Sequence, residues 1–361
     1  MRSKHYTTLR VEQLDDRITP DVGTVLGGAG NVQAYLSGGN LYIIGDGANN
    51  RLALWNVTPN AIRIQGNVTT INGSPTAQVF ALGAGRSVFI NLRGGDDRIV
   101  LGDNLNDDDN RSLSILGNLR IDLGNGDNTV GLENLYVGGT TTVRALGGND
   151  FLDIDTTLGQ PSFFKGNVSS TLGAGTNIVT GSTFGIGGNL SLTTGDDDDT
   201  INLANATVAK NLLIAANDGD NNITITDSDV NGNITRISTG VGDDDIELDS
   251  SDFKRLFIVA GDGANNVDVG VAGGGVTAVS VSVTTGEGAD TVNITDSDFQ
   301  LASSVSTGDD DDTINVSGSD FSPGGLTVDG GAGSNDTFTG LASSLGNNGL
   351  ISLNFIEIDD S

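Results

Sequence analysis

The sequence contains no cysteine, and its single histidine, His5, lies near the N-terminus. The absence of cysteine excludes disulfides, thiolate metal ligands and a cysteine nucleophile. With histidine confined to position 5, a histidine general base, a Ser-His-Asp triad and a histidine zinc site are excluded from the rest of the chain. Many enzyme mechanisms are removed on these two grounds alone.

Large apolar side chains are also scarce. The 361 residues include 12 Phe, 4 Tyr and 1 Trp against 54 Gly, which is too little bulk for a two-layer globular core of this length. The core must therefore consist of small and β-branched side chains in a thin structure. No apolar run reaches about 18 residues, so we expect no transmembrane helix and no membrane insertion.

Basic residues are few and unevenly placed. Residues 1–120 hold 11 Lys/Arg and 11 Asp/Glu, whereas residues 121–361 hold 6 and 36, so the net charge of −30 belongs to the second part. Binding to nucleic acid or to anionic lipid depends on clustered Lys and Arg, so neither is expected as a partner. The natural counterions of such a surface are metal cations.

The first 25 residues differ in character from the repeats. They have a basic start but no apolar stretch, which does not fit a standard secretory signal peptide. The run from Leu9 to Arg17, LRVEQLDDR, followed by Pro20, resembles the LRVEQLEDR leader of planctomycete exported and cell-surface proteins. This resemblance implies that residues 1–25 are a leader or export segment and that the protein is secreted or held at the cell surface. The alternative is a short amphipathic helix that caps the fold.

Residues 26–92 contain short alternating segments between Gly, Asn and Pro turns. Residues 40–44, 52–55 and 61–65 are examples, and their pattern is typical of strands and hairpins. We interpret this region as an N-terminal β cap, because a stack of repeats needs a cover over its first unit.

Residues 93–361 are built from one repeated pattern, G-x-G/D-x-[DN]-x-[IVL]-x-[IVL], with copies 21 to 27 residues apart. The alternating apolar positions after the Asn or Asp indicate a strand with one buried face. A later apolar anchor recurs at Val208, Val230, Phe253, Phe299 and Phe321, so each copy offers about three short strands. A period of about 22 residues without helical periodicity predicts an all-β fold, a right-handed parallel β-helix (a β-solenoid) whose rungs stack about 4.8 Å apart.

The fifth position of this pattern alternates between Asn and Asp. Stacked carboxylates one rung apart would repel by about 3.5 kcal/mol at an effective dielectric of about 20, whereas an intervening Asn supplies amide donors. We therefore predict a mixed Asn/Asp ladder that stabilises the turns, starting at Asp97 if that residue belongs to the preceding rung. The alternation ends at Asp290 and Asp312, where adjacent carboxylates would need a cation or a proton between them. The predicted ladder residues are Asn128, Asp150, Asn177, Asp199, Asn221, Asp244, Asn265, Asp290, Asp312 and Asn335.

Acidic clusters occupy the same turns, and stacked turns bring carboxylates and carbonyls together at the density that Ca²⁺ requires, about six to eight oxygens. Calcium is therefore the predicted cofactor. Segments 147–152 and 330–338 resemble the RTX nonapeptide GGxGxDxUx of calcium-binding β-rolls, although the repeat of that family is much shorter. The alternative is a solvated acidic face that keeps a Gly-rich solenoid soluble. The predicted metal ligands are Asp196, Asp197, Asp198, Asp199, Asp243, Asp244, Asp245, Asp290, Asp309, Asp310, Asp311 and Asp312.

The leading functional interpretation is a non-catalytic, secreted or cell-surface structural protein, adhesin-like and associated with calcium. Its partners would be cell-surface or matrix components or polysaccharide. The alternative is a carbohydrate-active β-helix, either a polysaccharide lyase or hydrolase or a glycan-binding module. No aromatic platform for sugar rings is evident on the repeats, and basic residues among so many acids are more often salt-bridge partners. We therefore assign no catalytic residues.

Overall fold

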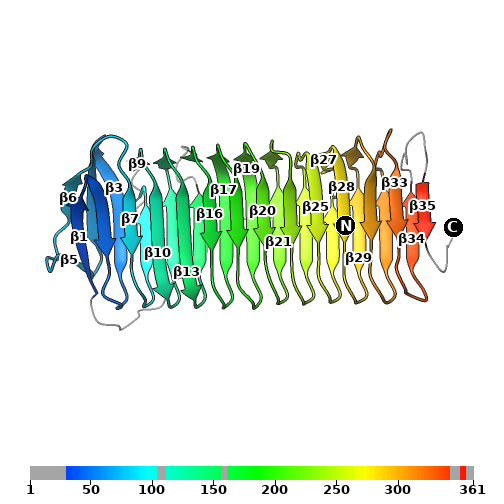
Figure 1. Cartoon of the computed structure of the whole chain (residues 1–361), viewed down its shortest axis with the longest axis horizontal. Coiled ribbons are helices and arrows are strands. Elements are labelled where there is room, and N and C mark those ends of the chain that lie inside the picture. Colours follow the sequence, from blue (N-terminus) through cyan, green and yellow to red (C-terminus); the bar gives the residue numbers. More distant parts are fainter. Residues whose placement is uncertain (1–29, 104–110, 156–160, 342–349, 355–361) are drawn as a thin grey trace, which may run out of the picture.

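The computed structural model describes residues 30–103, 111–155, 161–341 and 350–354. They form a parallel β-solenoid, in which the chain winds through successive rungs to give one long rod (Figure 1). The predicted all-β parallel solenoid is confirmed. The described residues contain no helix, and hence none that is long and apolar enough to cross a membrane.

Hydrogen bonding divides the strands into two large sheets and one small one. The 15-stranded sheet contains β1 (Asn31–Ser37), β2 (Asn40–Ile44), β5 (Thr70–Ile71), β7 (Val88–Asn91), β10 (Leu119–Asn125), β13 (Thr141–Gly147), β16 (Val168–Thr171), β18 (Leu190–Thr193), β20 (Leu212–Ala215), β23 (Thr235–Ser238), β25 (Arg255–Val259), β28 (Ser280–Thr284), β31 (Ser303–Ser306), β33 (Leu326–Asp329) and β35 (Leu350–Asn354). The 18-stranded sheet contains β3 (Arg51–Thr58), β4 (Ala61–Gly66), β6 (Gln78–Ala81), β8 (Arg98–Leu101), β9 (Leu113–Ile115), β11 (Thr129–Glu133), β12 (Leu135–Val137), β14 (Phe151–Asp155), β15 (Ser162–Phe164), β17 (Ile178–Ile186), β19 (Thr200–Val208), β21 (Asn222–Thr226), β22 (Asp229–Val230), β24 (Asp245–Asp249), β26 (Asn266–Val269), β29 (Thr291–Thr295), β32 (Thr313–Ser317) and β34 (Thr337–Leu341). The small sheet pairs β27 (Thr277–Ala278) with β30 (Asp298–Phe299).

One rung shows how the sequence pattern becomes three faces. Strand β18 forms the first face, and the Gly- and Asp-rich turn 194–199 leads into β19. The first half of β19 forms the second face, up to a corner at Asn205, whose φ is 51°. The second half, ending at Val208, forms the third face and pairs with β22 of the next rung. The chain then enters β20 in parallel register with β18.

The corner between the second and third faces requires a left-handed backbone in rung after rung. Non-glycine residues adopt positive φ there, including Asn134 at 46°, Asp227 at 49° and Asp296 at 48°. Asn and Asp tolerate this conformation better than most residues, because their short side chains can bond to the local backbone. The 18-stranded sheet thus bends at each corner and supplies two of the three faces.

The core is a narrow column of mostly aliphatic side chains, with a few phenylalanines, that runs from Val32 to Val328. It forms because alternate residues of each strand point inward, as in β21, where Ile223 and Ile225 are buried between exposed or partly exposed neighbours. The predicted third-face anchors, Val208, Val230, Phe253, Phe299 and Phe321, are all buried, with exposed fractions of 4% or less.

The turns approach one another too closely for side chains at certain positions. Gly263 has a φ of 130°, and a Cβ added there would collide with the backbone of Gly242 in the preceding rung. Glycine is therefore needed at this position both because the backbone has a positive φ and because successive turns stack too closely for a Cβ.

At the N-terminal end, antiparallel pairs cover the first rungs. Strand β1 pairs with β2, and β4 pairs with both β3 and β6. The parallel register is already present there, since β2 pairs with β7 and β3 pairs with β8. The first solenoid rung therefore lies within the segment predicted as a cap.

We expect Phe299→Ala to be strongly destabilising. The Phe299 ring is fully buried and stacks on Phe321 with the ring centroids 5.0 Å apart. Loss of this ring should lower the free energy of unfolding by about 3–5 kcal/mol, because the rigid rungs cannot close the cavity. Urea denaturation measures the change.

As a control, Phe163→Ala removes a ring that is 42% exposed and should change the free energy of unfolding by about 1 kcal/mol or less. Equal losses in the two variants would contradict the assigned core.

Candidate functional site in the stacked turns

Inside the turn between the first and second faces, one Asn or Asp from each rung forms a continuous inner ladder. Its members are Asn50, Asp97, Asn128, Asp150, Asn177, Asp199, Asn221, Asp244, Asn265, Asp290, Asp312 and Asp336, and each has an exposed fraction of 2% or less. The backbone N–H of every member except the last, Asp336, donates to Oδ1 of the member in the next rung, over 2.7 to 3.2 Å. The predicted ladder is thus present and begins earlier than expected, at Asn50.

The last member of the ladder differs from the prediction. Asp336, not Asn335, accepts from the N–H of Asp312, while the exposed Asn335 bonds to Asp311. The final turn contains one residue more than the repeat pattern allows, which shifts the register by one. The ladder therefore ends with three successive aspartates, at positions 290, 312 and 336.

In the asparagine rungs, the side-chain amide ties the turn to itself. Nδ2 of Asn177 donates to the carbonyls of Gly173 and Gly175, at 2.8 and 2.6 Å. In other asparagine rungs the same amide also reaches the carboxyl of the next rung, as from Asn128 to Asp150 at 2.8 Å. The predicted role of Asn as an amide donor to neighbouring carboxyl groups is therefore supported toward the next rung only, and in four rungs, those of Asn50, Asn128, Asn221 and Asn265.

In the aspartate rungs, a carboxyl oxygen takes the place of that amide. Since Oδ1 makes the same ladder bond in both residue types, Oδ2 occupies the position of Nδ2. Oδ2 of Asp97, Asp150, Asp199, Asp244, Asp290, Asp312 and Asp336 is buried without a hydrogen-bond partner. An ionised oxygen in such a place carries a large desolvation penalty, whereas a protonated carboxyl can donate to the turn carbonyls as Asn does.

Burial is the main cause of a raised pKa along the ladder. It raises the pKa of Asp97 to about 7 and the pKa of Asp150 to about 6, although hydrogen bonds from the preceding asparagine lower each of them in part. The pKa of Asp312 also rises to about 6, mainly through burial, with further contributions from the charges of Asp290 and Asp336. Burial raises the pKa values of Asp199, Asp244 and Asp290 as well.

A threonine accompanies four of these aspartates, five residues earlier in the chain. Thr194, Thr239, Thr285 and Thr307 precede Asp199, Asp244, Asp290 and Asp312. In the asparagine rungs the same position is apolar, as in Ala216 and Ala260. Each threonine hydroxyl lowers the pKa of its aspartate by less than burial raises it. The hydroxyl and the carboxyl are not joined by a hydrogen bond of standard length and angle. The threonine therefore offsets only some of the effect of burial.

A second, exposed ladder runs along the outside of the same turns, and its hydrogen bonds point the opposite way. The N–H of Asp220 donates to Oδ1 of Asp198 in the preceding rung, at 2.9 Å, and the N–H of Asp243 donates to Asp220 at 2.8 Å. Asp243 in turn accepts from Ala264 at 2.8 Å. These carboxylates satisfy the outer amides of the turns and keep a second oxygen toward solvent.

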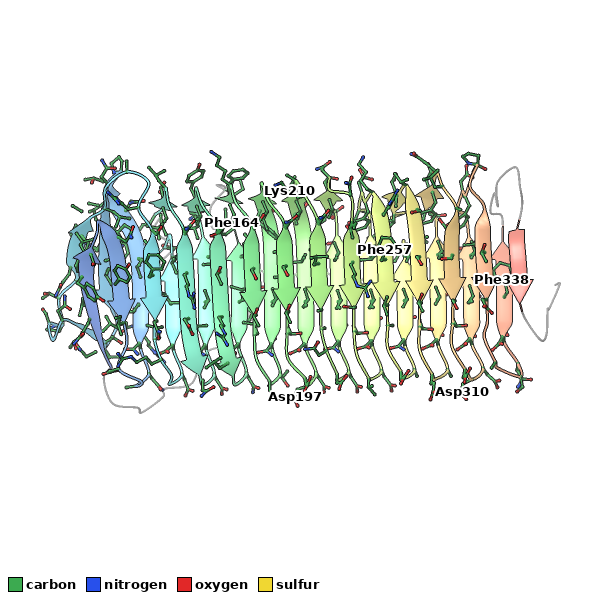
Figure 2. All side chains as sticks on the ribbon, in the orientation of Figure 1. Phe164, Asp197, Lys210, Phe257, Asp310 and Phe338 are labelled. Carbon is green, nitrogen blue, oxygen red and sulfur yellow. The ribbon has the colours of Figure 1, made fainter. Side chains whose placement is uncertain are left out.

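The twelve predicted metal ligands are divided between the inside and the outside of the turns. Asp199, Asp244, Asp290 and Asp312 are members of the inner ladder, whereas the other eight are exposed. Asp197 and Asp310 have positive φ values of 90° and 86° and lie on the same edge of the solenoid (Figure 2). Among the exposed eight, Asp197 accepts from the N–H of Gly175 at 2.9 Å, and Asp245 bonds to Asn266 at 2.9 Å.

The structure therefore separates residues that are adjacent in sequence. Within each run of aspartates, the last or middle residue turns inward while its neighbours face solvent. In the part of the chain that the structure describes, no three or more His, Cys, Asp or Glu side chains are grouped so that they could hold a metal ion.

A serine ladder at the corner between the second and third faces was not predicted. The N–H of Ala206 donates to Oγ of Ser228, and the N–H of Ser228 donates to Oγ of Ser251, both at 3.0 Å. Val276 takes the place of the serine in the next rung, and Ser297 and Ser319 then repeat the arrangement at 3.1 Å. The sequence signal is the recurring Ser-Asp-[Val/Phe] triplet, in which the serine points inward before an exposed aspartate.

The fold and its turns define the class of the protein, a parallel β-solenoid braced by internal Asn/Asp and Ser ladders. Comparison with protein-family models, with curated proteins and with solved structures finds no match to the chain.

The buried carboxyl groups predict that the protein is more stable in mild acid than in alkali. A carboxyl with a pKa raised above its ordinary 3.8 stabilises the folded state fully at pH values below 3.8, and this contribution is lost as the pH rises through the folded pKa, about 6 for Asp150 and about 7 for Asp97. Chemical denaturation at about pH 5 and about pH 8 should give the lower stability at pH 8.

The variant Asp150→Asn should remove part of this pH dependence, because the new amide can donate to the turn as Asn128 does. We expect the variant to be more stable than the wild type at about pH 8, by about 1–3 kcal/mol, with little difference at about pH 5. Asp127→Asn is the control, since Asp127 is exposed and its Oδ1 acceptor, used by Asn149, is retained. A similar gain in both variants would attribute the effect to net charge and contradict the role of the buried carboxyl.

Proposed function

We propose that this protein is a non-catalytic structural scaffold of the cell exterior, an adhesin-like rod that displays its surface at a distance. The observation that supports this most strongly is the unbroken inner ladder, eleven backbone-to-side-chain bonds from Asn50 to Asp336. Buried hydrogen bonds contribute about 1 kcal/mol each, and in a repeat stack such terms add from rung to rung. A rod that is braced in this way resists opening at any point along its length.

The external location is proposed from three features taken together. The N-terminal residues, which lie outside the described residues, resemble the leader of exported proteins. The chain has no cysteine to be oxidised outside the cell, and its net charge of −30 keeps an extended Gly-rich surface soluble and separated from copies of itself. Each of these features suits an extracellular rod.

Calcium is proposed as a counterion of the acidic turn edge. Asp198, Asp220 and Asp243 each use one oxygen as a backbone acceptor and offer the other to solvent. A row of such oxygens one rung apart concentrates divalent cations by its field. The proposal assigns them a screening role and no fixed coordination geometry.

The location is tested in the organism that produces the protein. Intact cells are treated with an external protease, and the chain is followed by antibody in the cell, surface and medium fractions. We expect the protein in the medium or in the protease-sensitive surface fraction, and we expect deletion of residues 1–25 to retain it inside the cell. Recovery of the intact full-length protein only from the cytosol would refute the proposal.

The role of calcium is tested by thermal melting of the full chain in millimolar Ca²⁺ and in Mg²⁺ at matched ionic strength. If the cations act by screening, both should raise the melting temperature by a similar amount. A cation that binds at a dedicated site of the folded protein would instead raise the melting temperature by an amount set by its own affinity for that site. A calcium-specific rise that Asp243→Asn abolishes would replace the screening role with a structural calcium site.

A further inference from the structure

The outward-facing positions of the third face form a row, one residue per rung, which we call the third-face row. The strand register and the single bridges align its members in chain order. They are Tyr136, Phe163, Gly185, Thr207, Asp229, Asp252, Thr277, Asp298 and Asp320. The row is thus aromatic toward the N-terminal end and acidic toward the C-terminal end.

The aromatic end of the row is a stacked and accessible pair. The rings of Tyr136 and Phe163 have centroids 6.2 Å apart and planes inclined by 19°, and the residues are 36% and 42% exposed. In the next rung, a Cβ on Gly185 would come within 2.9 Å of Cδ2 of Phe163. The glycine therefore leaves room for the Phe163 ring to lie over its backbone. The result is an aromatic platform on the repeats, which was not evident from the sequence.

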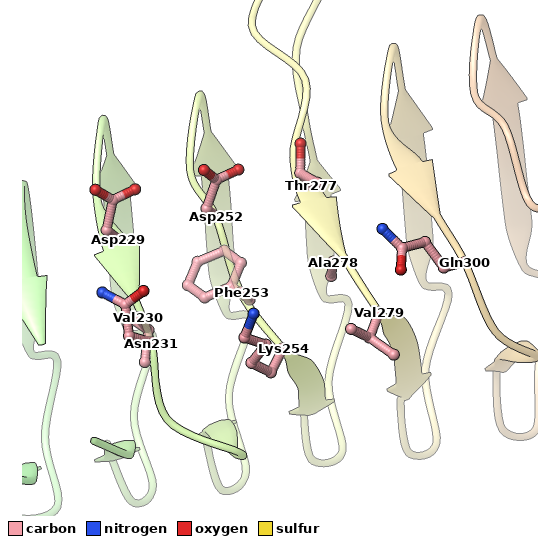
Figure 3. Close-up of a pocket in the computed structure, with 10 residues that line it drawn as sticks. All are labelled: Asp229, Val230, Asn231, Asp252, Phe253, Lys254, Thr277, Ala278, Val279 and Gln300. Carbon is pink, nitrogen blue, oxygen red and sulfur yellow. The ribbon is translucent and has the colours of Figure 1, made fainter. Parts of the chain in front are cut away.

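The acidic end of the row borders a groove. The groove has a volume of about 310 Å³, and its polar lining includes Asp229, Asp252 and Lys254 from adjacent rungs (Figure 3). Asn231, one rung before Lys254, and Gln300, two rungs after it, add side-chain amides, and Phe253 and Ala278 form part of the buried floor. Figure 3 shows the two carboxylates in line along the rod, with the lysine stem below them. Lys254 takes part in no salt bridge among the described residues.

The side chains of this surface limit the class of ligand that it can bind. An aromatic platform and a groove with a few placed polar groups are features of small-molecule and saccharide sites. The row of carboxylates disfavours polyanions, including nucleic acid and acidic glycans. The backbone N–H and C=O groups of the face are already paired between rungs, so a peptide cannot add to it as an extra strand. Carboxylates form their strongest hydrogen bonds with cationic donors.

We propose that the third face binds a linear polysaccharide that carries protonated amino groups, with sugar rings on Tyr136 and Phe163 and amino groups on Asp229 and Asp252. The rungs repeat about every 4.8 Å, which is close to the length of one sugar unit in an extended chain. Successive rungs can thus meet successive sugars along the row. The binding goes beyond the scaffold role and does not depend on where the protein is located.

The test measures binding to the purified full-length protein by isothermal titration at mildly acidic pH. The probes are a glucosamine oligomer, its fully N-acetylated neutral counterpart, and a polygalacturonate oligomer of the same length. We expect the order cationic, then neutral, with no binding of the anionic chain. The double variants Tyr136→Ala/Phe163→Ala and Asp229→Asn/Asp252→Asn should each weaken binding of the cationic probe at least about tenfold, which corresponds to about 1.4 kcal/mol.

A matched control separates the groove from general charge attraction. Asp220→Asn/Asp243→Asn removes the same two charges from adjacent rungs on the turn edge and keeps the Oδ1 acceptors of the outer ladder. This variant should bind the glucosamine oligomer within about twofold of the wild type, because exposed charges farther away than the Debye length are screened. Equal losses in the control and the groove variant would overturn the proposed site.

Two further outcomes would also overturn the proposal. Absence of glucosamine-oligomer binding would remove the ligand class altogether. Binding of an oligolysine peptide that is as tight as glucosamine-oligomer binding and equally sensitive to the groove variants would reassign the surface to a protein partner. Neither outcome affects the protease and fractionation result that tests the external location of the scaffold, so the two proposals fail separately.

Discussion

The hydrogen bond from a turn amide to the Asn or Asp of the next rung is the interaction on which the rest of this structure depends. Strands satisfy their own backbone groups, but in each turn the chain leaves the sheet, and the N–H of the inner Asn or Asp is buried inside the turn. A buried, unpaired N–H would weaken each rung. One side chain per rung accepts that N–H and repeats the contact from Asn50 to Asp336. The ladder therefore fixes the register of the strands on either side of every turn.

The same interaction explains the mixture of Asn and Asp. Either residue can supply the accepting Oδ1, but only Asn also supplies an amide to the turn carbonyls. An aspartate in that position leaves Oδ2 buried and unpaired, and burial raises the pKa of the ladder aspartates from Asp97 to Asp312. Thr194 and its counterparts stand beside several of these carboxyl groups and offset part of that effect. The raised pKa values thus link the expected stability of the turns to protonation of the ladder aspartates.

Aspartates elsewhere on the rod differ in role although their chemistry is the same. On the turn edge, Asp198 and Asp243 are tied to backbone amides of the next rung. On the third face, Asp229 and Asp252 project beside Lys254 at a groove. The first set is used by the fold, whereas the second is available to a ligand. A count of acidic residues cannot distinguish these two sets, because the difference lies in which amide or cavity each carboxylate meets.

The sequence by itself determined the features that repeat at short range. The period of the rungs, the strands with one buried face and the alternation of Asn128, Asp150 and Asn177 are all set by local spacing. Tertiary structure decided the features that depend on register over longer distances. Tyr136 and Phe163 become neighbours only when rungs of unequal length are aligned, and Asp336 replaces Asn335 because the last turn is one residue longer. Side chains from different rungs meet through stacking, and stacking is set by the three-dimensional winding of the chain.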